Sequence, residues 1–130
     1  MVSSVAAFPC GWGLVAKLIL RVRRDLSTVI RIVDAIDTIR DHNVPLISIM
    51  HTDVNDVEVC LDVTEANWPG PVGVYAHSGD YVEDKWIFEN VINPEDYATL
   101  ADRWLDRGVQ VIGGCCGIGP SHIQSLSGLN

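Results

Sequence analysis

The sequence predicts an α/β protein in which helices alternate with parallel strands. Apolar residues recur at helical spacing in long segments, short apolar runs separate these segments, and proline and glycine mark the boundaries. Strands joined through helices pair in parallel by right-handed crossovers, so the expected order is β-α-β-α-β-α. The length of 130 residues suits one domain. This pattern fits either an open doubly wound sheet or part of an eight-stranded barrel.

The first half of the chain holds a helix, a strand and a second helix. Residues 26–42 carry apolar side chains at three- and four-residue spacing, which predicts an amphipathic helix. These side chains are Leu26, Val29, Ile30, Val33, Ile36 and Ile39. Pro45 opens the run PLISIM, which is too short for a helix and suits a buried strand. The letters HTD end this strand, and Asp53 is expected to cap a second helix that extends through Trp68. Its inward side chains are Val54, Val57, Leu61 and Thr64, with Cys60 also in the core.

The second half repeats this alternation. WPGP forms a turn, and VGVYA at residues 72–76 forms the next strand. A long loop then leads to a helix with Asn93 as its cap and Pro94 at its first position. The inward face of this helix is Tyr97, Leu100, Ala101, Trp104 and Leu105. The remaining elements are Gly108 as the helix end, VQVIG at residues 109–113 as the third strand and PSHIQSL at residues 120–126 as a last short helix.

Residues 1–25 have no assigned element, although GLVAKLILRV within them is apolar enough to add one strand at a sheet edge. A secretory signal is not expected, because Arg21, Arg23 and Arg24 follow the apolar run instead of preceding it. No stretch reaches the roughly 18 apolar residues that a membrane span needs. We therefore expect a soluble cytoplasmic protein with no membrane partner.

Charge and cysteine content narrow the functional classes. The formal net charge of -8 at pH 7 argues against a nucleic-acid partner, because DNA and RNA require clustered lysine and arginine. The chain has four cysteines, and in a cytoplasmic protein these are more often thiols or metal ligands than disulfides.

Reactive side chains follow each of the three predicted strands. His51 follows the first strand, His77 and Ser78 follow the second, and the adjacent Cys115 and Cys116 follow the third. In both candidate architectures, functional groups gather at the carboxyl ends of parallel strands. We therefore expect these side chains at one rim of the sheet.

Two cysteines and a histidine at one rim match the ligands that zinc prefers. Three protein ligands with an open fourth position are typical of a catalytic zinc site. Adjacent cysteines share one metal only where the backbone turns sharply, and Gly113, Gly114 and Gly117 make such a turn sterically accessible. His51 and His77 are both candidates for the third ligand.

Other interpretations of this motif remain open. The cysteines could pack as small hydrophobic side chains, or Cys116 and His77 could form a nucleophilic pair. The spacing G-x-x-G-x-G could suggest a phosphate loop, but two cysteines in its centre argue against that. No functional role is assigned to Cys10, His42 and His122.

The segment VIGGCCGIGPSHIQSL, residues 111–126, closely resembles the C-terminal signature of the homocysteine S-methyltransferase family. GPVGVYAHSGDY, residues 70–81, looks like that family's penultimate strand and loop. The similarity extends over residues 26–130 and does not include residues 1–25. The resemblance implies an α/β fold that is the C-terminal part of a (β/α)8 TIM barrel, with about three βα units and parallel strands. Residues 1–130 would then form a single partial barrel domain.

The resemblance also implies the ligands of a zinc ion. Family members hold zinc with an adjacent cysteine pair, which corresponds to Cys115 and Cys116, and with one cysteine at the end of an earlier strand. The corresponding position here is His51 in LISIMHTD, 64 residues before Cys115. Imidazole is an ordinary zinc ligand. A neutral imidazole in place of a thiolate leaves the site one unit more positive, which acidifies a bound thiol more and leaves it less nucleophilic.

The activity implied by the resemblance is methyl transfer to the thiol of homocysteine or a related compound. The thiol would fill the open zinc position, lose its proton and attack a methyl group on a sulfonium, ammonium or folate-type donor. The resemblance covers only the last three or so of eight barrel units, so we expect a truncated protein or fragment of doubtful activity alone. Self-association is one way to cover its exposed sheet edges. The alternatives are a non-catalytic zinc-binding or assembly module and a small α/β protein that binds no metal.

Overall fold

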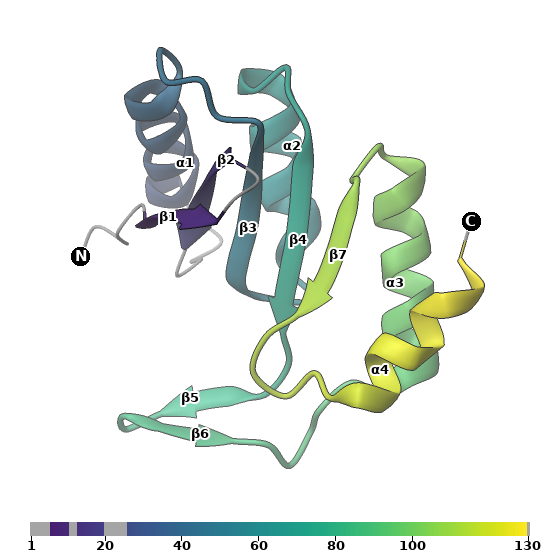
Figure 1. The fold of residues 1–130 in the computed structure, drawn as a ribbon. Helices are drawn as coiled ribbons and strands as arrows, with labels where there is room; N and C mark the ends of the chain where they lie inside the picture. The colour runs from purple at the N-terminus through teal and green to yellow at the C-terminus, as the bar shows by residue number, and fades with distance from the viewer. Residues whose placement is uncertain (1–5, 11–12, 20–25, 130) are drawn as a thin grey trace.

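The computed structural model describes the backbone of residues 6–10, 13–19 and 26–129, and side chains from residue 31 to residue 129. Its main sheet has five strands in the order β1-β2-β3-β4-β7 (Figure 1). These strands are β1 (Ala6–Cys10), β2 (Gly13–Ile19), β3 (Leu46–Asp53), β4 (Val72–His77) and β7 (Val111–Gly114). The strands β2, β3, β4 and β7 run parallel, whereas β1 is antiparallel to β2. The expected α/β class with parallel strands is therefore confirmed.

Helices connect the parallel strands and cover one face of the sheet. They are α1 (Leu26–Ile39), α2 (Val57–Asn67), α3 (Pro94–Asp106) and the short α4 (Pro120–Ser125), which continues into a 3-10 turn (Leu126–Gly128). A single buried core joins α1, α2 and α3 to the alternate side chains of β3 and β4 that point toward them. The carboxyl ends of β3, β4 and β7 lie together at the opposite end of the sheet from the α1–β3 and α2–β4 connections (Figure 1).

The predicted helix α3 is confirmed in its cap, core face and end. The Asn93 side chain accepts a hydrogen bond from the Asp96 amide at 2.8 Å, and Pro94 occupies the first turn. Gly108 ends the helix with φ +93°, a conformation that favours glycine. Three side chains of the predicted inward face are fully buried, namely Tyr97, Ala101 and Trp104. The predicted core positions of α2 are also buried, namely Val54, Val57, Cys60, Leu61 and Thr64.

The predicted start of α2 was wrong. Asp53 does not cap this helix, because its carboxylate accepts hydrogen bonds from the backbone and side-chain amides of Asn55 at 2.9 and 2.8 Å. It closes the turn before the helix, which begins at Val57 after Asp56. The strand β3 correspondingly extends through the letters HTD, which were expected to end it.

The buried face of α1 and the start of β7 also differ from the prediction. Ile32 is fully buried although it was not assigned to the inward face, whereas Val33 is only half-buried. Apolar residues flank the stripe on both sides, so spacing alone does not select its centre. The strand β7 begins two residues later than predicted, because the Val109 amide donates to the Trp104 carbonyl at 3.1 Å and still belongs to the turn after α3.

A β-hairpin occupies the segment that was predicted to be a long loop. Its antiparallel strands are β5 (Asp80–Val82) and β6 (Lys85–Ile87), and it extends from the carboxyl end of β4 (Figure 1). Glu83 and Asp84 form the turn with φ of 48° and 60°. Glycine and asparagine usually fill such left-handed turns, so the acidic pair gave no hairpin signal. Within the described chain, no helix combines the length and the apolar character of a membrane span.

Candidate metal centre

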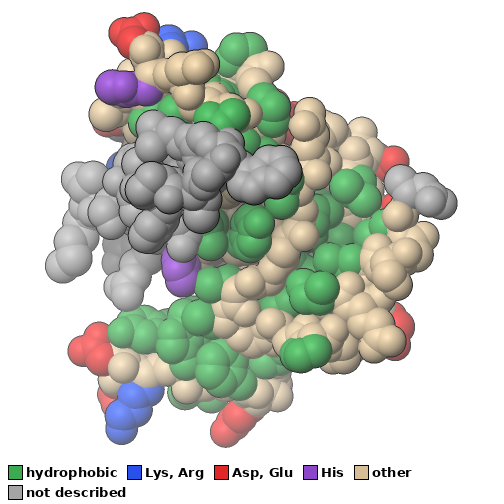
Figure 2. All heavy atoms as spheres, viewed as in Figure 1, with side chains coloured by type: hydrophobic (Ala, Val, Ile, Leu, Met, Phe, Trp, Pro, Cys, Tyr) green, Lys and Arg blue, Asp and Glu red, His purple; other side chains and the backbone are tan. Residues whose placement is uncertain are grey.

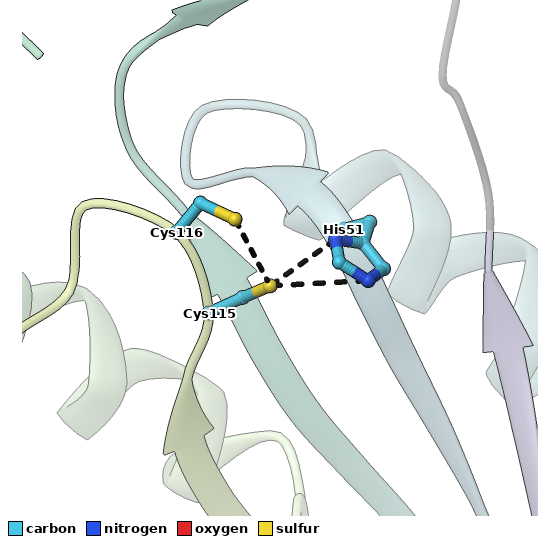
Figure 3. A group of neighbouring side chains, drawn as sticks. All are labelled: His51, Cys115 and Cys116. Atoms are coloured by element: carbon cyan, nitrogen blue, oxygen red, sulfur yellow. Dashed lines mark hydrogen bonds between the residues drawn. The ribbon is translucent and has the colours of Figure 1, made fainter. Parts of the chain in front are cut away.

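The carboxyl end of β3 departs from regular strand geometry at His51. The pairing of β3 with β4 shifts register between Met50 and Asp53. His51 has φ 52°, in the left-handed region that non-glycine residues rarely adopt. A bulge of this kind turns a side chain away from the alternation of the strand. The His51 ring consequently points toward the loop after β7 (Figure 3).

The loop after β7 is fixed against the end of β4. The Cys115 amide donates to the Ala76 carbonyl at 2.9 Å, and the Ser78 amide donates to the Cys116 carbonyl at 3.0 Å. Gly117 follows with φ 78°, and a Cβ atom there would lie 1.9 Å from the Ser78 carbonyl oxygen. Only glycine fits this close approach of two backbone segments. The loop therefore turns sharply enough to direct both thiols to one side (Figure 3).

The three predicted ligands come together at this edge. The Cys115 sulfur lies 3.1 Å from His51 Nδ1 and 4.0 Å from His51 Nε2. The two sulfur atoms are 3.8 Å apart. One donor atom from each of His51, Cys115 and Cys116 lies within 4.8 Å of the others, and all three residues are partly buried. Among the residues that the structure describes, these three form the group of histidine, cysteine or acidic side chains whose donor atoms lie close enough together to hold one metal ion.

Two of the three separations are close to those around one tetrahedral zinc ion. Two thiolates bound at about 2.3 Å and at the tetrahedral angle lie roughly 3.8 Å apart, which matches the sulfur separation of 3.8 Å. A thiolate and an imidazole nitrogen would lie roughly 3.5 Å apart, a few tenths of an ångström beyond the 3.1 Å between Cys115 and His51 Nδ1. The donor set of two sulfurs and one nitrogen also suits zinc and leaves a fourth position for another ligand.

The two neighbouring thiols influence each other's ionisation. Burial raises the pKa of Cys116, and the hydrogen bond and charge of Cys115 raise it further. Two adjacent thiolates repel each other, and a bound cation would reverse this effect. Burial and the nearby Cys115 also raise the pKa of Tyr97. The Tyr97 phenol therefore stays protonated and donates to the Gly113 carbonyl just before the cysteines.

His77, the other candidate ligand, lies outside the described metal-binding group. Its Nε2 atom is 4.0 Å from an Asp53 carboxylate oxygen, and its ring contacts Trp86 edge-on with centroids 5.0 Å apart. Burial lowers the pKa of His77, with a partial opposing effect from Asp53.

Aromatic side chains of the hairpin lie beside the cysteine loop. The Trp86 ring stacks on the Phe88 ring with centroids 5.7 Å apart. The Tyr81 ring is tilted against the same Trp86 ring, with centroids 5.3 Å apart. A Cβ atom on Gly117 would be 3.4 Å from the Phe88 ring, which places this ring against the loop. Tyr81 and Phe88 are 43% and 50% exposed, and hydrophobic side chains gather over the hairpin in Figure 2. The sequence pattern did not reveal this surface, because these residues were predicted to form a loop, although their aromatic content was a usable signal.

Comparison with known proteins identifies related sequences. The sequence profile of the family described as homocysteine S-methyltransferase matches residues 20–129, which confirms the resemblance. Homocysteine S-methyltransferase 2 of Arabidopsis thaliana is 34% identical over 59 residues, covering 43% of this chain and 18% of that protein. Selenocysteine Se-methyltransferase of Brassica oleracea var. italica is 30% identical over 59 residues, covering 43% of this chain and 17% of that protein.

A bacterial relative extends the aligned region. Homocysteine S-methyltransferase YbgG of Bacillus subtilis is 27% identical over 77 residues, covering 58% of this chain and 24% of that protein. The matches thus span less than a quarter of the length of these relatives. No solved structure matches the chain significantly.

Proposed function

Because this chain belongs to the homocysteine S-methyltransferase family, we propose that it binds zinc and takes part in methyl transfer to homocysteine or a related thiol. The observation that carries this proposal is the convergence of His51, Cys115 and Cys116 from two strand ends. We further propose that residues 26–130 correspond to the C-terminal part of a (β/α)8 barrel domain. The parallel strands and the placement of the site at their carboxyl ends support this assignment.

Each ligand has a defined role in this proposal. Cys115 and Cys116 would hold the ion as thiolates, and His51 would hold it through a ring nitrogen, of which Nδ1 is nearer to the Cys115 sulfur. Zinc, when bound, would supply a Lewis acid that lowers the pKa of a substrate thiol. The neutral imidazole gives the site one more unit of positive charge than a third thiolate would, which favours binding an anionic thiolate.

The hairpin surface supports a positively charged methyl donor over a folate-type donor. Tyr81, Trp86 and Phe88 present aromatic rings, and such rings attract onium groups. The same segment carries four exposed carboxylates, namely Asp80, Glu83, Asp84 and Glu89, against the single Lys85. An acidic, aromatic surface repels the carboxylate tail of a folate and attracts a sulfonium or ammonium compound.

We expect Trp86→Ala to raise the KM for a cationic donor at least severalfold, because the central ring of the aromatic stack is lost. The KM for the thiol should change little. Initial-rate measurements with each substrate varied in turn test this expectation, with exposed Val59→Ala on α2 as the control. A larger effect on the thiol KM than on the donor KM would contradict it.

The metal content of the purified chain tests the proposed site. Wild-type protein should contain about one zinc per chain, and a Cys115→Ser, Cys116→Ser variant should contain none. His51→Ala should lose substantial zinc affinity, whereas His77→Ala should retain it, because His77 lies outside the group. Equal and negligible zinc in wild type and the double variant would exclude a metal site and favour cysteines that serve only in packing.

A second candidate function is a zinc-binding or assembly module without activity. The aligned segments cover only 17% to 24% of the length of the three relatives described above. Most of the length of those proteins therefore has no aligned counterpart in this chain. Stoichiometric zinc without methyl transfer from any donor class would favour this second function. Methyl transfer to homocysteine by this chain would exclude it.

A further inference from the structure

A closed circuit of hydrogen bonds lies beside the cysteine loop. The Ser78 amide donates to the Cys116 carbonyl at 3.0 Å, and the Ser78 hydroxyl accepts from the Ile92 amide at 2.8 Å. The Ile92 carbonyl in turn accepts from His122 Nε2 at 2.6 Å. The Gly119 amide then donates to His122 Nδ1 at 3.1 Å, which returns the circuit to the loop. Four segments of the chain are thus joined around the loop that carries both thiols.

We propose that His122 is a positioning residue that holds the loop Cys115–Gly119 in the conformation needed for metal binding. This inference rests on the proposed metal site and adds a residue that touches neither the ion nor its ligands. His122 acts at one end of the loop through Gly119, and through Ile92 and Ser78 it also acts on Cys116.

The chemistry of the circuit accounts for a histidine at this position. His122 must accept a hydrogen bond at Nδ1 and donate one at Nε2, which one neutral tautomer of imidazole does with both ring nitrogens. Ser78 and His122 are only 4% and 8% exposed. Buried polar groups that lose their partners are costly, so an apolar side chain would leave the Gly119 amide and the Ile92 carbonyl unsatisfied.

The ring of His122 also packs on the residue that fixes the other end of the loop. The Tyr97 ring lies edge-on to it with centroids 5.8 Å apart, and the Tyr97 hydroxyl donates to the Gly113 carbonyl. His122 and Tyr97 therefore hold the backbone after and before the cysteines. The segment from the end of β7 into the loop contains Gly113, Gly114 and Gly117, which give its backbone much conformational freedom. Each residue that is ordered beforehand reduces the entropy that metal binding must overcome.

Three variants separate positioning from packing. His122→Leu keeps a bulky side chain against Tyr97 but removes both hydrogen bonds. His122→Gln carries an amide oxygen and an amide N–H, so it can restore the acceptor and the donor, and glutamine at this third helical position suits a capping box. Ile36→Val removes one methyl group from the fully buried core of α1 and serves as the control for general destabilisation.

Cobalt(II) is the probe, with affinity measured by chelator competition and the site observed through thiolate-to-cobalt absorption. We expect His122→Leu to weaken cobalt binding about tenfold to a hundredfold, because substitution of residues that orient metal ligands commonly costs this much affinity. We also expect the absorption band to shift, because the two thiolates would be held less firmly. His122→Gln should bind more tightly than His122→Leu, and Ile36→Val should match wild type in affinity and spectrum.

Amide hydrogen exchange in the metal-free protein provides the second readout. Exchange of the Gly119 and Ser78 amides should be faster in His122→Leu than in wild type and slower again in His122→Gln. Equal cobalt affinity in wild type and His122→Leu, or unchanged exchange at Gly119, would overturn the positioning role alone. Absence of cobalt and zinc binding by wild type would instead overturn the proposed metal site, and this inference with it.

Discussion

The backbone of His51 adopts a conformation that a side chain disfavours, and the ligand set depends on that conformation. Its φ of 52° lies in the left-handed region, which costs a residue with a Cβ roughly 1 to 2 kcal/mol. The surrounding sheet must supply this energy, because the register shift in β3 holds the residue in place. The cost is offset in function if the bulge brings the imidazole to Cys115.

Comparison of two variants at His51 measures this strain. Both His51→Gly and His51→Ala remove the imidazole, but only glycine adopts a positive φ without steric cost. We expect metal-free His51→Gly to be more stable than His51→Ala by about 1 kcal/mol, measured by urea unfolding with a chelator present. Because glycine loses more chain entropy on folding than alanine, an unstrained backbone would instead make His51→Ala the more stable variant by roughly 0.4 to 1 kcal/mol.

Cys60 should make the stability of the protein fall at alkaline pH. Burial, with a contribution from Asp56, raises its pKa from 9.0 to about 12 in the folded state. Above pH 9 the unfolded thiol loses its proton while the folded thiol keeps it, so unfolding becomes more favourable as the pH rises. Relative to Cys60→Ala, wild type should lose up to about 1.4 kcal/mol of unfolding free energy per pH unit from 9 toward 12. Urea unfolding at pH 7.5, 9 and 10 checks this slope, and parallel profiles for the two proteins would refute it.

A single arginine makes most of the ion pairs between helix α2 and the end of helix α3. Arg107 at the end of α3 contacts three carboxylates of α2, with 2.7 Å to Asp62, 3.0 Å to Glu65 and a further bond to Glu58. Its side chain is 24% exposed, whereas Arg103, which pairs only with Glu58, is 58% exposed. A planar guanidinium carries five donors in a rigid fork and can bind several carboxylates from different directions, whereas the compact ammonium of lysine has three donors on one atom.

We therefore expect Arg107→Lys to lower the unfolding free energy by about 1 to 2 kcal/mol. The matched change Arg103→Lys should cost less than about 0.5 kcal/mol, because exposed single pairs contribute little. Urea unfolding at low and high salt tests both, and the Arg107 effect should shrink less with salt than a fully exposed pair would. An equal cost for the two substitutions would contradict this assignment.

At the scale of elements, the sequence predicted segments well where one physical signal dominated. The cap Asn93–Pro94, the stripe of Tyr97, Ala101 and Trp104, and the stop at Gly108 specify α3 without outside information. The hairpin escaped prediction because its turn is formed by Glu83 and Asp84 with positive φ, where glycine or asparagine would have given a recognisable signal. The end of β3 escaped it because the Asp53 carboxylate bonds to Asn55 and not to the start of α2.

The convergence of the three proposed ligands was predictable, but its geometry was not. Parallel strands place His51, Cys115 and Cys116 at one edge, which follows from the alternation of helices and strands. The choice of His51 over His77 depends on a bulge, which has no sequence signal here. The role of His122 depends on contacts with the distant Ile92, which local patterns do not reveal.

At the scale of the whole molecule, the sheet has two different edges. The antiparallel β1 covers β2, whereas β7 is the edge strand at the other side. A barrel would continue from β7 with another parallel strand, so the barrel proposal places its missing partner at that edge. Self-association through the same edge is the corresponding proposal for this chain by itself.

Zinc should stabilise the entire domain, because its proposed ligands come from different strands. Binding to the folded state alone adds about 2.7 kcal/mol when free zinc is one hundred times the dissociation constant. We expect zinc to raise the urea midpoint of wild type and to leave a Cys115→Ser, Cys116→Ser variant unchanged. A similar rise in both proteins would place the stabilising zinc elsewhere.

The separation of the ligands along the chain has one more consequence. His51 and Cys115 are 64 residues apart, and the exposed turn at Glu83 and Asp84 lies between them. A protease that cuts this turn would leave two polypeptides, with His51 on the first and both Cys115 and Cys116 on the second. Bound zinc would then link the two fragments, and a chelator would weaken the association between them.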